Sequence, residues 1–393
     1  GNPGTASEEG IENVAITDIP GLVGFAKEQS DGMTVVGPEA PLAAGVVDAF
    51  RAAGLKVFGP TQRAARLEAS KDFAKAFMAR HGLPTAGYRT FTDPAEAHRY
   101  LESRGAPIVV KADGLAAGKG VVVAMSLAEA HAAVDSMLVG NTLGDAGARV
   151  VIEDFLEGEE ASFIVMADGR NVLPLATSQD HKRLLDGDAG PNTGGMGAYS
   201  PAPVITPKVH AKVMREVIQP AIAGMEKDGE PYTGFLYAGL MIGKGGEVRV
   251  LEFNCRMGDP ETQPIMLRLK TDLLTLLEHA VAGTLDRAEA EWDRRTALGV
   301  VMAAAGYPDA PRKGDVIRGL PRAEEDFHVF HAGTAEREGQ VVTAGGRVLC
   351  VTALGDSVKL AQRRAYQVAE RISFAGRQMR RDIGYRAINA RRR

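Results

Sequence analysis

Cysteine is scarce in this 393-residue chain, which contains only Cys255 and Cys350. The two are far apart and no C-x-x-C pair occurs, so the sequence excludes a disulfide framework and a thiolate zinc site. This usage is typical of a reducing compartment, and we expect a cytoplasmic protein. The chain also lacks an apolar run of the roughly 18 residues that a membrane span needs, and no signal peptide opens it.

An excess of charge of either sign is also lacking, since the formal net charge is -4 at pH 7. This balance gives no reason to expect nucleic acid or an anionic membrane as a partner. Hydrophobic residues make up 45% and charged residues 24% of the chain, which is ordinary for a globular protein with real cores. The length predicts two to four domains of roughly 100 to 200 residues each. We expect a monomer or a weak homo-oligomer.

The chain has no initiator methionine, and its opening GNPGTASEEG is typical of a loop. The elements expected next are strands at 14–16, 33–37 and 56–59 and helices at 19–29 and 40–53. This alternation predicts a parallel sheet with flanking helices. Such a sheet normally begins with a strand, so we expect a strand and a helix, on the order of 30 residues, to precede Gly1 in the natural protein.

The rest of the chain is expected to hold mixed elements in three predicted domains, 1–68, 69–290 and 291–393. Helices are predicted at 61–67, 70–80, 93–103, 126–138, 206–227, 264–282 and 357–372. Strands are predicted at 109–124 (a hairpin), 150–154, 162–166, 237–242, 247–254, 298–303, 327–332 and 347–354. Residues of about 90–160 would form a small α+β lobe, and the last hundred residues a separate α+β domain. Residues 178–203 have little periodicity and predict a long loop, which is usually functional or disordered.

The stretch VVKADGLAAGKGVVVA, residues 109–124, has the composition of a phosphate-binding loop. A Walker loop needs four residues between its first glycine and Gly-Lys, then a hydroxyl residue, and it opens a helix. Here three residues separate Gly114 from Gly118 and Lys119, Gly120 replaces the hydroxyl residue, and a β-branched run at 121–123 follows. The glycines therefore join two strands.

A kinase-type glycine-rich loop does not fit either, because Val123 stands where the third glycine belongs. What remains is a hairpin whose tip can fold over the phosphates of a nucleotide with its backbone N–H groups, flanked by Lys111 and Lys119. An ordinary glycine hairpin turn is an equally good interpretation of the loop alone.

The strand at 249–255, RVLEFNC, carries two oxygen donors. Its alternation predicts that Glu252 and Asn254 share one face, while Leu251, Phe253 and Cys255 share the apolar one. Two donors about 7 Å apart can converge on one hard cation, and magnesium prefers one or two protein carboxylates together with substrate phosphates. A solvated polar strand face is the alternative.

The next loop, RMGDPETQP at 256–264, concentrates polar groups directly after this strand. It contains the cation Arg256, the carboxylates of Asp259 and Glu261, and an amide. Such density is unusual for a connection. It suits the recognition of a small polar substrate that carries an amine and a phosphate or carboxylate.

Taken together, these features resemble the ATP-grasp superfamily, and within it the glycinamide ribonucleotide synthetases, or phosphoribosylamine-glycine ligases, of purine biosynthesis. The resemblance rests on GNPGTA, VVGPEAPL, KADGLAAGKGV, SQDHKR, GPNTGGMGAYSP, TGFLYAGLM, EFNCRMGDPETQP, HAGT and GGRVLCVTALG. It implies an α/β plus α+β fold: an ATP-grasp fold between an N-terminal parallel-sheet, Rossmann-like domain and a C-terminal α+β domain. The family's first strand and phosphate loop would precede Gly1, and the closing MRRDIGYRAI keeps only the latter half of the family's usual pattern.

The resemblance also implies ATP, Mg²⁺ or Mn²⁺, and roles for individual residues. On the nucleotide it implies Lys71 and Lys111 at the phosphates, a closing flap from Gly114 to Gly120 with Gly118 and Lys119, Glu153 at the adenine amino group, Phe155 and Leu156 along the ring, and Glu159 or Glu160 at the ribose. For the metal it implies Glu252 and Asn254. Without the family, Lys71 would be a solvated helix lysine and Glu153 a plain edge-strand charge.

The implied reaction joins glycine to 5-phosphoribosylamine through a glycyl phosphate, at the expense of ATP. Arg256 would stabilise the glycyl phosphate. The residues expected to orient the amine and the ribose phosphate are Asp180, Lys182, Asp259 and Glu261, helped by Asn2, Gly4 and Glu39 from the first domain. Three alternatives stay open: an ATP-dependent kinase, a nucleotide-binding module without catalysis, and another purine-pathway ATP-grasp ligase or carboxylase.

Overall fold

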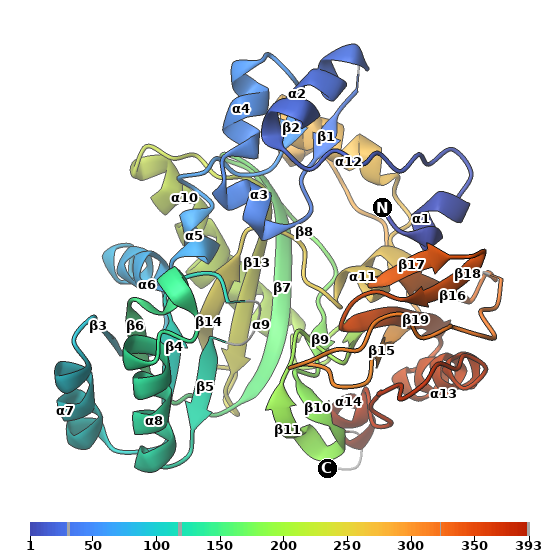
Figure 1. The fold of residues 1–393 in the computed structure, drawn as a ribbon. Coiled ribbons are helices and arrows are strands. Elements are labelled where there is room, and N and C mark those ends of the chain that lie inside the picture. The colour runs from blue at the N-terminus through green and yellow to red at the C-terminus, as the bar shows by residue number, and fades with distance from the viewer. Residues whose placement is uncertain (30–31, 117–119, 323, 391–393) are drawn as a thin grey trace.

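The computed structural model describes residues 1–29, 32–116, 120–322 and 324–390. Its main sheets are a two-stranded parallel sheet near the N-terminus, a four-stranded sheet in a small lobe, a four-stranded central sheet and a five-stranded sheet built largely from C-terminal strands. In Figure 1 the central strands β7, β13 and β14 stand between the small lobe on the left and the C-terminal strands on the right. No helix in these ranges is long and apolar enough to cross a membrane.

The N-terminal region contains the predicted parallel pair, because β1 and β2 run parallel with Thr34 opposite Val57. Its elements are α1 (Pro3–Ser7), α2 (Ile19–Glu28), β1 (Thr34–Val35), α3 (Glu39–Ala43), α4 (Val46–Ala52) and β2 (Val57–Phe58). The strand predicted at 14–16 is wrong, since these residues pair with no strand. The helix predicted at 40–53 is divided at Gly45, whose φ of 88° lies in the left-handed region.

Residues 88–154, called the small lobe below, form a hairpin-based sheet with helices packed on it. Its elements are β3 (Tyr88–Phe91), α7 (Pro94–Arg104), β4 (Ile108–Ala112), β5 (Val121–Ala124), α8 (Leu127–Val134) and β6 (Val150–Asp154), in the strand order β3-β6-β4-β5. The predicted caps are present: Asp93 accepts from the N–H groups of Ala95 and Glu96, and Ser126 accepts from that of Glu129. Before this lobe come α5 (Arg66–Ala69) and α6 (Lys71–Arg80).

The central sheet has the order β14-β13-β7-β8 and a helical layer on each face. Its strands are β7 (Glu159–Asp168), β8 (Val172–Pro174), β13 (Thr233–Ile242) and β14 (Val248–Asn254); its helices are α9 (Pro207–Val213), α10 (Gln219–Lys227), α11 (Thr262–Arg268) and α12 (Leu273–Ala282). Alternate residues of β7 enter opposite cores: Phe163 packs with residues of α9 and α10, and Ile164 with residues of α11 and α12. The single helix predicted at 264–282 is wrong, because Asp272 caps a new helix by accepting from the N–H of Thr275.

The long loop predicted at 178–203 is wrong too, because four short strands lie within it. They are β9 (Gln179–Asp180), β10 (Arg183–Leu185), β11 (Ala189–Asn192) and β12 (Gly197–Ser200). Strands β9 and β12 extend a sheet of order β16-β19-β15-β12-β9, so the C-terminal sheet is not confined to the last hundred residues. Strand β9 pairs with β12 and β10 with β11, and only β12 also pairs with a distant strand, β15. The strands have two to four residues each, which is too short for local periodicity to reveal them.

The other members of this region are β15 (Thr296–Ala303), β16 (Phe327–His331), β17 (Thr334–Arg337), β18 (Gln340–Thr343), β19 (Arg347–Gly355), α13 (Val358–Ala369) and α14 (Tyr385–Ala390). The amphipathic helix α13 covers β15 and β19. The first helix, α1, lies beside β16 and β17, whereas α14 lies at the other side of the C-terminal strands (Figure 1).

Strand β14 contains an irregularity that the sequence did not predict. Gly239 of β13 pairs with Glu252, but the next residue, Leu240, pairs with Val250, so Leu251 is an extra residue on β14. The bulge reverses the alternation: Val250 and Phe253 both enter the core, whereas Leu251 lines a cavity. The expectation that Leu251 shares the core face is therefore wrong, although Glu252 and Asn254 do share the cavity side.

The bulge predicts unequal costs for two truncations on one strand. Phe253→Ala should lower the free energy of unfolding by roughly 3–5 kcal/mol, because a buried aromatic ring leaves a cavity. Leu251→Ala should cost about 1 kcal/mol, since its side chain is only half-buried at the cavity wall. Urea denaturation of both variants measures the difference. Equal costs would mean that Leu251 lies in the core, as strict alternation requires.

Candidate active site

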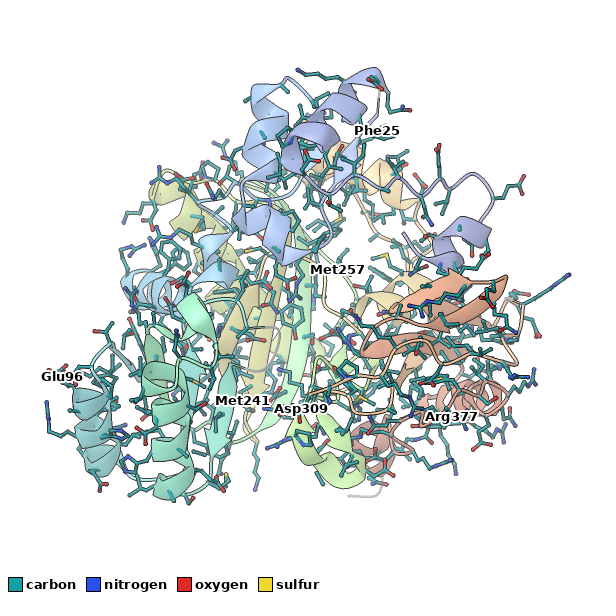
Figure 2. The ribbon with its side chains drawn as sticks, viewed as in Figure 1. Phe25, Glu96, Met241, Met257, Asp309 and Arg377 are labelled. Atoms are coloured by element: carbon teal, nitrogen blue, oxygen red, sulfur yellow. The ribbon has the colours of Figure 1, made fainter. Side chains whose placement is uncertain are left out.

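A cavity of about 1770 Å³ opens between the small lobe, the central sheet, the N-terminal region and the C-terminal region. Met241 and Met257, which line it, lie in the middle of the molecule, whereas Glu96 on α7 lies at its outer edge (Figure 2). The predicted site residues in the lining are Glu39, Lys71, Lys111, Gly120, Glu153, Phe155, Leu156, Glu159, Glu160, Asp180, Lys182, Glu252, Asn254, Arg256, Asp259 and Glu261. Most of the predicted site is thus brought together around one space.

Three predicted residues do not line this cavity. The side-chain amide of Asn2 donates to the carbonyl oxygen of His331 at 3.0 Å and its oxygen caps α1. A Cβ on Gly4 would lie 2.6 Å from Cβ of His331, so Gly4 is required for close packing of α1. Gly114 donates its N–H to Ala146 at the edge of the small lobe. Two other residues of the predicted flap, Gly118 and Lys119, lie outside the described residues.

A buried carboxylate between two lysines forms one wall of the cavity. Glu153 on β6 contacts Nζ of Lys75 at 2.8 Å with one oxygen and Nζ of Lys111 at 2.9 Å with the other. All three side chains are at most 7% exposed. Burial lowers the pKa of Lys75 to about 8. Lys111 also donates to the carbonyl oxygen of Leu251 at 3.1 Å, which joins the small lobe to β14.

Lys75 was missed by the sequence reasoning, although a signal was present. It lies four residues after Lys71 in α6, and residues at that spacing share one face of a helix. Lys71 Nζ donates to the carbonyl oxygen of Gly114 at 3.1 Å, and burial lowers its pKa. Both lysines of α6 therefore face the small lobe at the cavity, and neither is a solvated surface charge.

At the end of β14, Glu68 holds three consecutive residues in place. Its oxygens accept from the backbone N–H of Cys255 at 2.7 Å and contact the guanidinium of Arg256 at 2.8 Å. With the amide of Asn254 oriented so that its nitrogen donates, that nitrogen reaches Glu68 at 3.3 Å, and its oxygen is the atom left to bind a cation. Burial raises the pKa of Glu68 to about 7. Nothing in the local sequence indicated this carboxylate.

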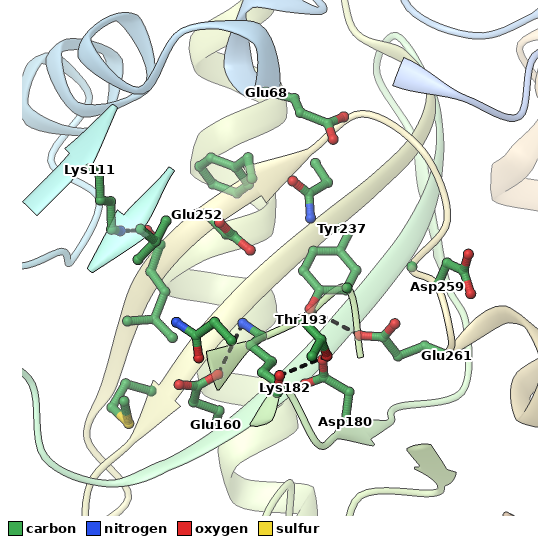
Figure 3. A pocket seen from close by; sticks show the side chains of 18 of the residues that line it. Glu68, Lys111, Glu160, Asp180, Lys182, Thr193, Tyr237, Glu252, Asp259 and Glu261 are labelled. Atoms are coloured by element: carbon green, nitrogen blue, oxygen red, sulfur yellow. Dashed lines mark hydrogen bonds and ion pairs between the residues drawn. The ribbon is translucent and has the colours of Figure 1, made fainter. Parts of the chain in front are cut away.

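Glu252 is an ionised carboxylate facing several cations. Burial opposes its ionisation, but Lys182, Lys111 and Lys71 outweigh that effect and hold the pKa of Glu252 below its ordinary value. Figure 3 shows Glu252 on the central strands, between Lys111 and Lys182. Across residues 1–29, 32–116, 120–322 and 324–390, no group of three or more His, Cys, Asp or Glu side chains is arranged to hold a metal ion.

The two carboxylates of the loop after β14 are both fixed by neighbours. Glu261, only 2% exposed, accepts from the hydroxyl groups of Ser162 at 2.8 Å and Tyr237 at 3.1 Å. Asp259 pairs with Arg347 of β19 at 2.9 Å. The same guanidinium donates to the carbonyl oxygen of Gly194, so Arg347, another residue that the sequence did not single out, ties two loops to the C-terminal sheet.

The opposite end of the cavity is formed partly by the C-terminal helix α14. Arg386 pairs with Asp188 at 2.7 Å and donates to the backbone carbonyl oxygen of Asp180 at 3.3 Å. Lys182 pairs with Glu160 at 3.0 Å. The sequence did not predict that α14 reaches this cavity. At this end of the cavity, several cations lie beside carboxylates. Such a lining suits a ligand that carries both phosphate and amine groups.

Models of one family match three consecutive parts of the chain. The model described as the phosphoribosylglycinamide synthetase N domain matches residues 1–68, the ATP-grasp (A) domain residues 69–262, and the C domain residues 297–386.

Similar proteins carry a consistent name. The chain is 68% identical over 388 residues to a phosphoribosylamine–glycine ligase of Ralstonia nicotianae, covering 99% of this chain and 92% of that protein. It is 63% identical over 390 residues to one of Neisseria meningitidis, with the same coverage of 99% and 92%.

Among solved structures, the phosphoribosylamine–glycine ligase of Thermotoga maritima matches with a TM-score of 0.76 at 40% identity, over 84% of this chain and 82% of that one. The biotin carboxylase domain of a Hydrogenobacter thermophilus 2-oxoglutarate carboxylase matches with a TM-score of 0.72 at 18% identity, over 92% and 78% of the two chains, which shows a shared fold alone. The predicted ATP-grasp fold is thereby confirmed. The chain belongs to the phosphoribosylglycinamide synthetase family.

Proposed function

We propose that this protein ligates glycine to 5-phosphoribosylamine at the expense of ATP, giving glycinamide ribonucleotide, ADP and phosphate in purine biosynthesis. The observation that carries the proposal is the membership of nearly the whole chain in one ligase family. The cavity supports it, because most of the residues expected at the nucleotide and at the other substrates line the same space.

The reaction needs an activated carboxylate. Oxide is a poor leaving group, so glycine is first phosphorylated by ATP to glycyl phosphate, and the amine then displaces phosphate. Phosphoryl transfer asks a protein for positioning and charge neutralisation more than for covalent help. The lining residues, rich in Lys, Arg and carboxylates, supply those two functions.

On the nucleotide side, we assign Lys71 and Lys111 to the phosphates and residues 114–120, of which 117–119 lie outside the described residues, to the proposed flap. Phe155 and Leu156 would line the adenine, Glu153 would accept from its amino group, and Glu159 or Glu160 would bind the ribose. Glu153 is tied to both Lys75 and Lys111, so it also sets where Lys111 lies. Glu160 pairs with Lys182, which makes Glu159 the better ribose candidate.

For the metal, Mg²⁺ or Mn²⁺, we assign Glu252 and the amide oxygen of Asn254. The donor set fits a hard cation, because Glu252 is held ionised and both side chains line the cavity. One or two protein ligands together with substrate phosphates is a usual arrangement for magnesium. When bound, the ion neutralises charge on the transferring phosphoryl group.

On the substrate side, we assign Arg256 to the glycyl phosphate and Asp180, Lys182, Asp259 and Glu261 to the amine and the ribose phosphate. Glu39 supports this grouping because it contacts Arg256 at 3.4 Å. Asn2 and Gly4 pack against the C-terminal region, and a direct role for them in binding stays a prediction.

We further propose three domains, 1–68, 69–290 and 291–393, with β9 and β12 of the second extending the sheet of the third. Cys255 and Cys350 are free and buried, which is compatible with the cytoplasm as the proposed location.

The proposed function is tested by measuring ADP release with substrates omitted in turn. Without an added substitute amine, a ligase releases ADP only when glycine and the ribosylamine are both present, and it forms glycinamide ribonucleotide in equal amount. A kinase would form a stable phosphorylated product without the amine. ADP release that needs only one of the two substrates would contradict the ligase assignment.

Glu252→Gln should lower turnover by about 100-fold or more while the free energy of unfolding changes by less than about 1 kcal/mol, because the side chain faces the cavity and not a core. Asn254→Ala should act in the same direction. Steady-state kinetics over a magnesium titration, beside urea denaturation, separates the two effects. Unchanged activity at saturating magnesium would remove the metal assignment.

Lys111→Met should weaken ATP binding and turnover together, because a phosphate-facing cation is lost in both the ground state and the transition state. Lys75→Met is the matched control, since it removes the other lysine from Glu153 without removing the cation assigned to phosphate. Calorimetric ATP titration of both variants distinguishes them. Normal ATP affinity in Lys111→Met would show that Lys111 serves only to pair with Glu153 in the buried cluster of Glu153, Lys75 and Lys111.

A further inference from the structure

Among the acidic residues of the cavity lining that are buried, Asp180 is the one whose carboxylate has no partner in the described part of the chain; Glu68, Glu153 and Glu261 each have one. It lies on β9, its side chain lines the cavity, and the residue is 8% exposed. Throughout the part of the chain that the structure describes, no hydrogen bond or ion pair uses its carboxylate oxygens; only its backbone carbonyl is engaged, by Arg386. Figure 3 shows the side chain at the end of the cavity beside Lys182 and Glu261.

Four other carboxylates of the cavity lining have partners, whereas those of Glu252, Glu157 and Glu159, which are less buried than Asp180, have none. Glu261 accepts two hydroxyl hydrogen bonds, Asp259 pairs with Arg347, and Glu160 pairs with Lys182. Asp188 accepts from Tyr385 and pairs with Arg386. A buried carboxylate left unpaired is costly for folding, so its retention in a cavity indicates a functional role.

The electrostatic surroundings hold a proton on Asp180 more readily than on an ordinary aspartate. Burial, together with the nearby Glu261 and Glu160, raises the pKa of Asp180 to about 7, although Lys182 and Arg386 oppose this rise. A carboxylate with such a pKa can accept a proton near neutral pH and release it again to water.

The second half of the proposed reaction produces a proton that needs an acceptor. The amine nitrogen bonds to the carbonyl carbon of glycyl phosphate, and the bond from that carbon to the phosphate oxygen breaks, releasing inorganic phosphate. The nitrogen becomes cationic when it attacks and must lose one proton before the product is a neutral amide. Nothing in the first half, phosphoryl transfer to glycine, requires this acceptor.

We propose that Asp180 is the general base that takes the proton from the attacking amine. The proposal rests on the ligase function and adds a catalytic role to a residue otherwise assigned only to orientation. It requires Asp180 to be ionised when the amine attacks, and it leaves Glu261, which is fixed by Ser162 and Tyr237, to orient the substrate.

The decisive experiment separates the two halves of the reaction in Asp180→Asn. Hydroxylamine replaces the ribosylamine in one assay, because it is small, needs no ribose phosphate contacts and can lose its proton to buffer; the product is glycine hydroxamate. Hydroxamate formation should stay within about threefold of the unsubstituted protein, while formation of glycinamide ribonucleotide should fall about 100-fold or more. Asp180→Glu should recover part of the second activity.

Asp186→Asn is the matched control. It makes the same charge change in the adjoining segment, on an exposed residue outside the cavity lining. Its backbone partner, the N–H of Arg381, keeps an acceptor oxygen in the variant. Both activities of Asp186→Asn should match those of the unsubstituted protein.

Two pH measurements add readouts that a structural role would not change. Amide formation by the unsubstituted protein should rise with pH to a plateau above about 7, and Asp180→Asn should lack that rise. Because the folded protein binds the proton of Asp180 more tightly than the unfolded chain does, stability due to this group falls as pH rises from 3.8 toward 7. Asp180→Asn should therefore gain stability relative to the unsubstituted protein over that interval.

The outcomes are distinguishable. Equal loss of hydroxamate and amide formation would show that Asp180 binds glycine or maintains the fold, and unchanged amide formation would show that it is dispensable; either result overturns the proposal, as does an unfolded Asp180→Asn. If the unsubstituted protein lacks ADP release dependent on glycine and amine, the ligase function itself fails.

Discussion

The placement of the small lobe over the central sheet depends on one buried carboxylate shared by two lysines. Glu153 lies on β6, Lys111 on the adjacent β4 and Lys75 on α6, and Lys111 extends to the carbonyl of Leu251 on β14. Four elements from three parts of the fold therefore meet at these charges. Removing one member of such a buried group typically costs 3–5 kcal/mol, because the remaining charge is left uncompensated. The arrangement also leaves an excess positive charge at the cavity wall, where the phosphates of ATP are assigned.

Strand β14, whose backbone Lys111 of this cluster contacts, positions the other charged groups of the cavity. The bulge at Leu251 directs its carbonyl to Lys111 and keeps Glu252 and Asn254 on the cavity side, while Phe253 anchors the strand in the core. Directly after it, Glu68 fixes Cys255 and Arg256. The carboxylate of Glu252, assigned to the metal, and the guanidinium of Arg256, assigned to the glycyl phosphate, lie within five residues without pairing with each other, because Arg256 is paired with Glu68 and Glu252 faces the lysines.

The sequence predicted well those features that depend on local patterns. The hairpin β4–β5, the caps at Asp93 and Ser126 and the parallel pair β1–β2 follow from turn residues, capping side chains and alternation over a few residues. The strands within 178–203 could not be predicted in this way, since each has only two to four residues, too few to show an alternating pattern, and β12 also pairs with the distant β15. The bulge in β14 was missed for a related reason: register is a property of two strands, and one strand shows only an alternating pattern.

The site was predicted in part. The predicted residues Glu252, Arg256 and Lys111 all line one cavity. They could be predicted because motif spacing shows which residues share a strand face or a loop. The sequence did not predict four residues, because each forms its ion pair or hydrogen bond with a residue from another part of the chain. They are Lys75, Glu68, Arg347 and Arg386. Asn2 and Gly4 were placed at the site by family resemblance, and their packing against the C-terminal strands depends on contacts across the whole length of the protein.

The most direct test of this account is a crystal structure of the protein with a non-hydrolysable ATP analogue, magnesium and glycine. The account predicts the triphosphate between Lys71 and Lys111 on one side and Glu252 and Asn254 on the other, with the carboxylate of glycine beside Arg256. Glu153 should remain in contact with Lys75. A nucleotide bound elsewhere, or a triphosphate whose oxygens approach neither lysine, would contradict the claim that the buried ion cluster positions the cations of the site.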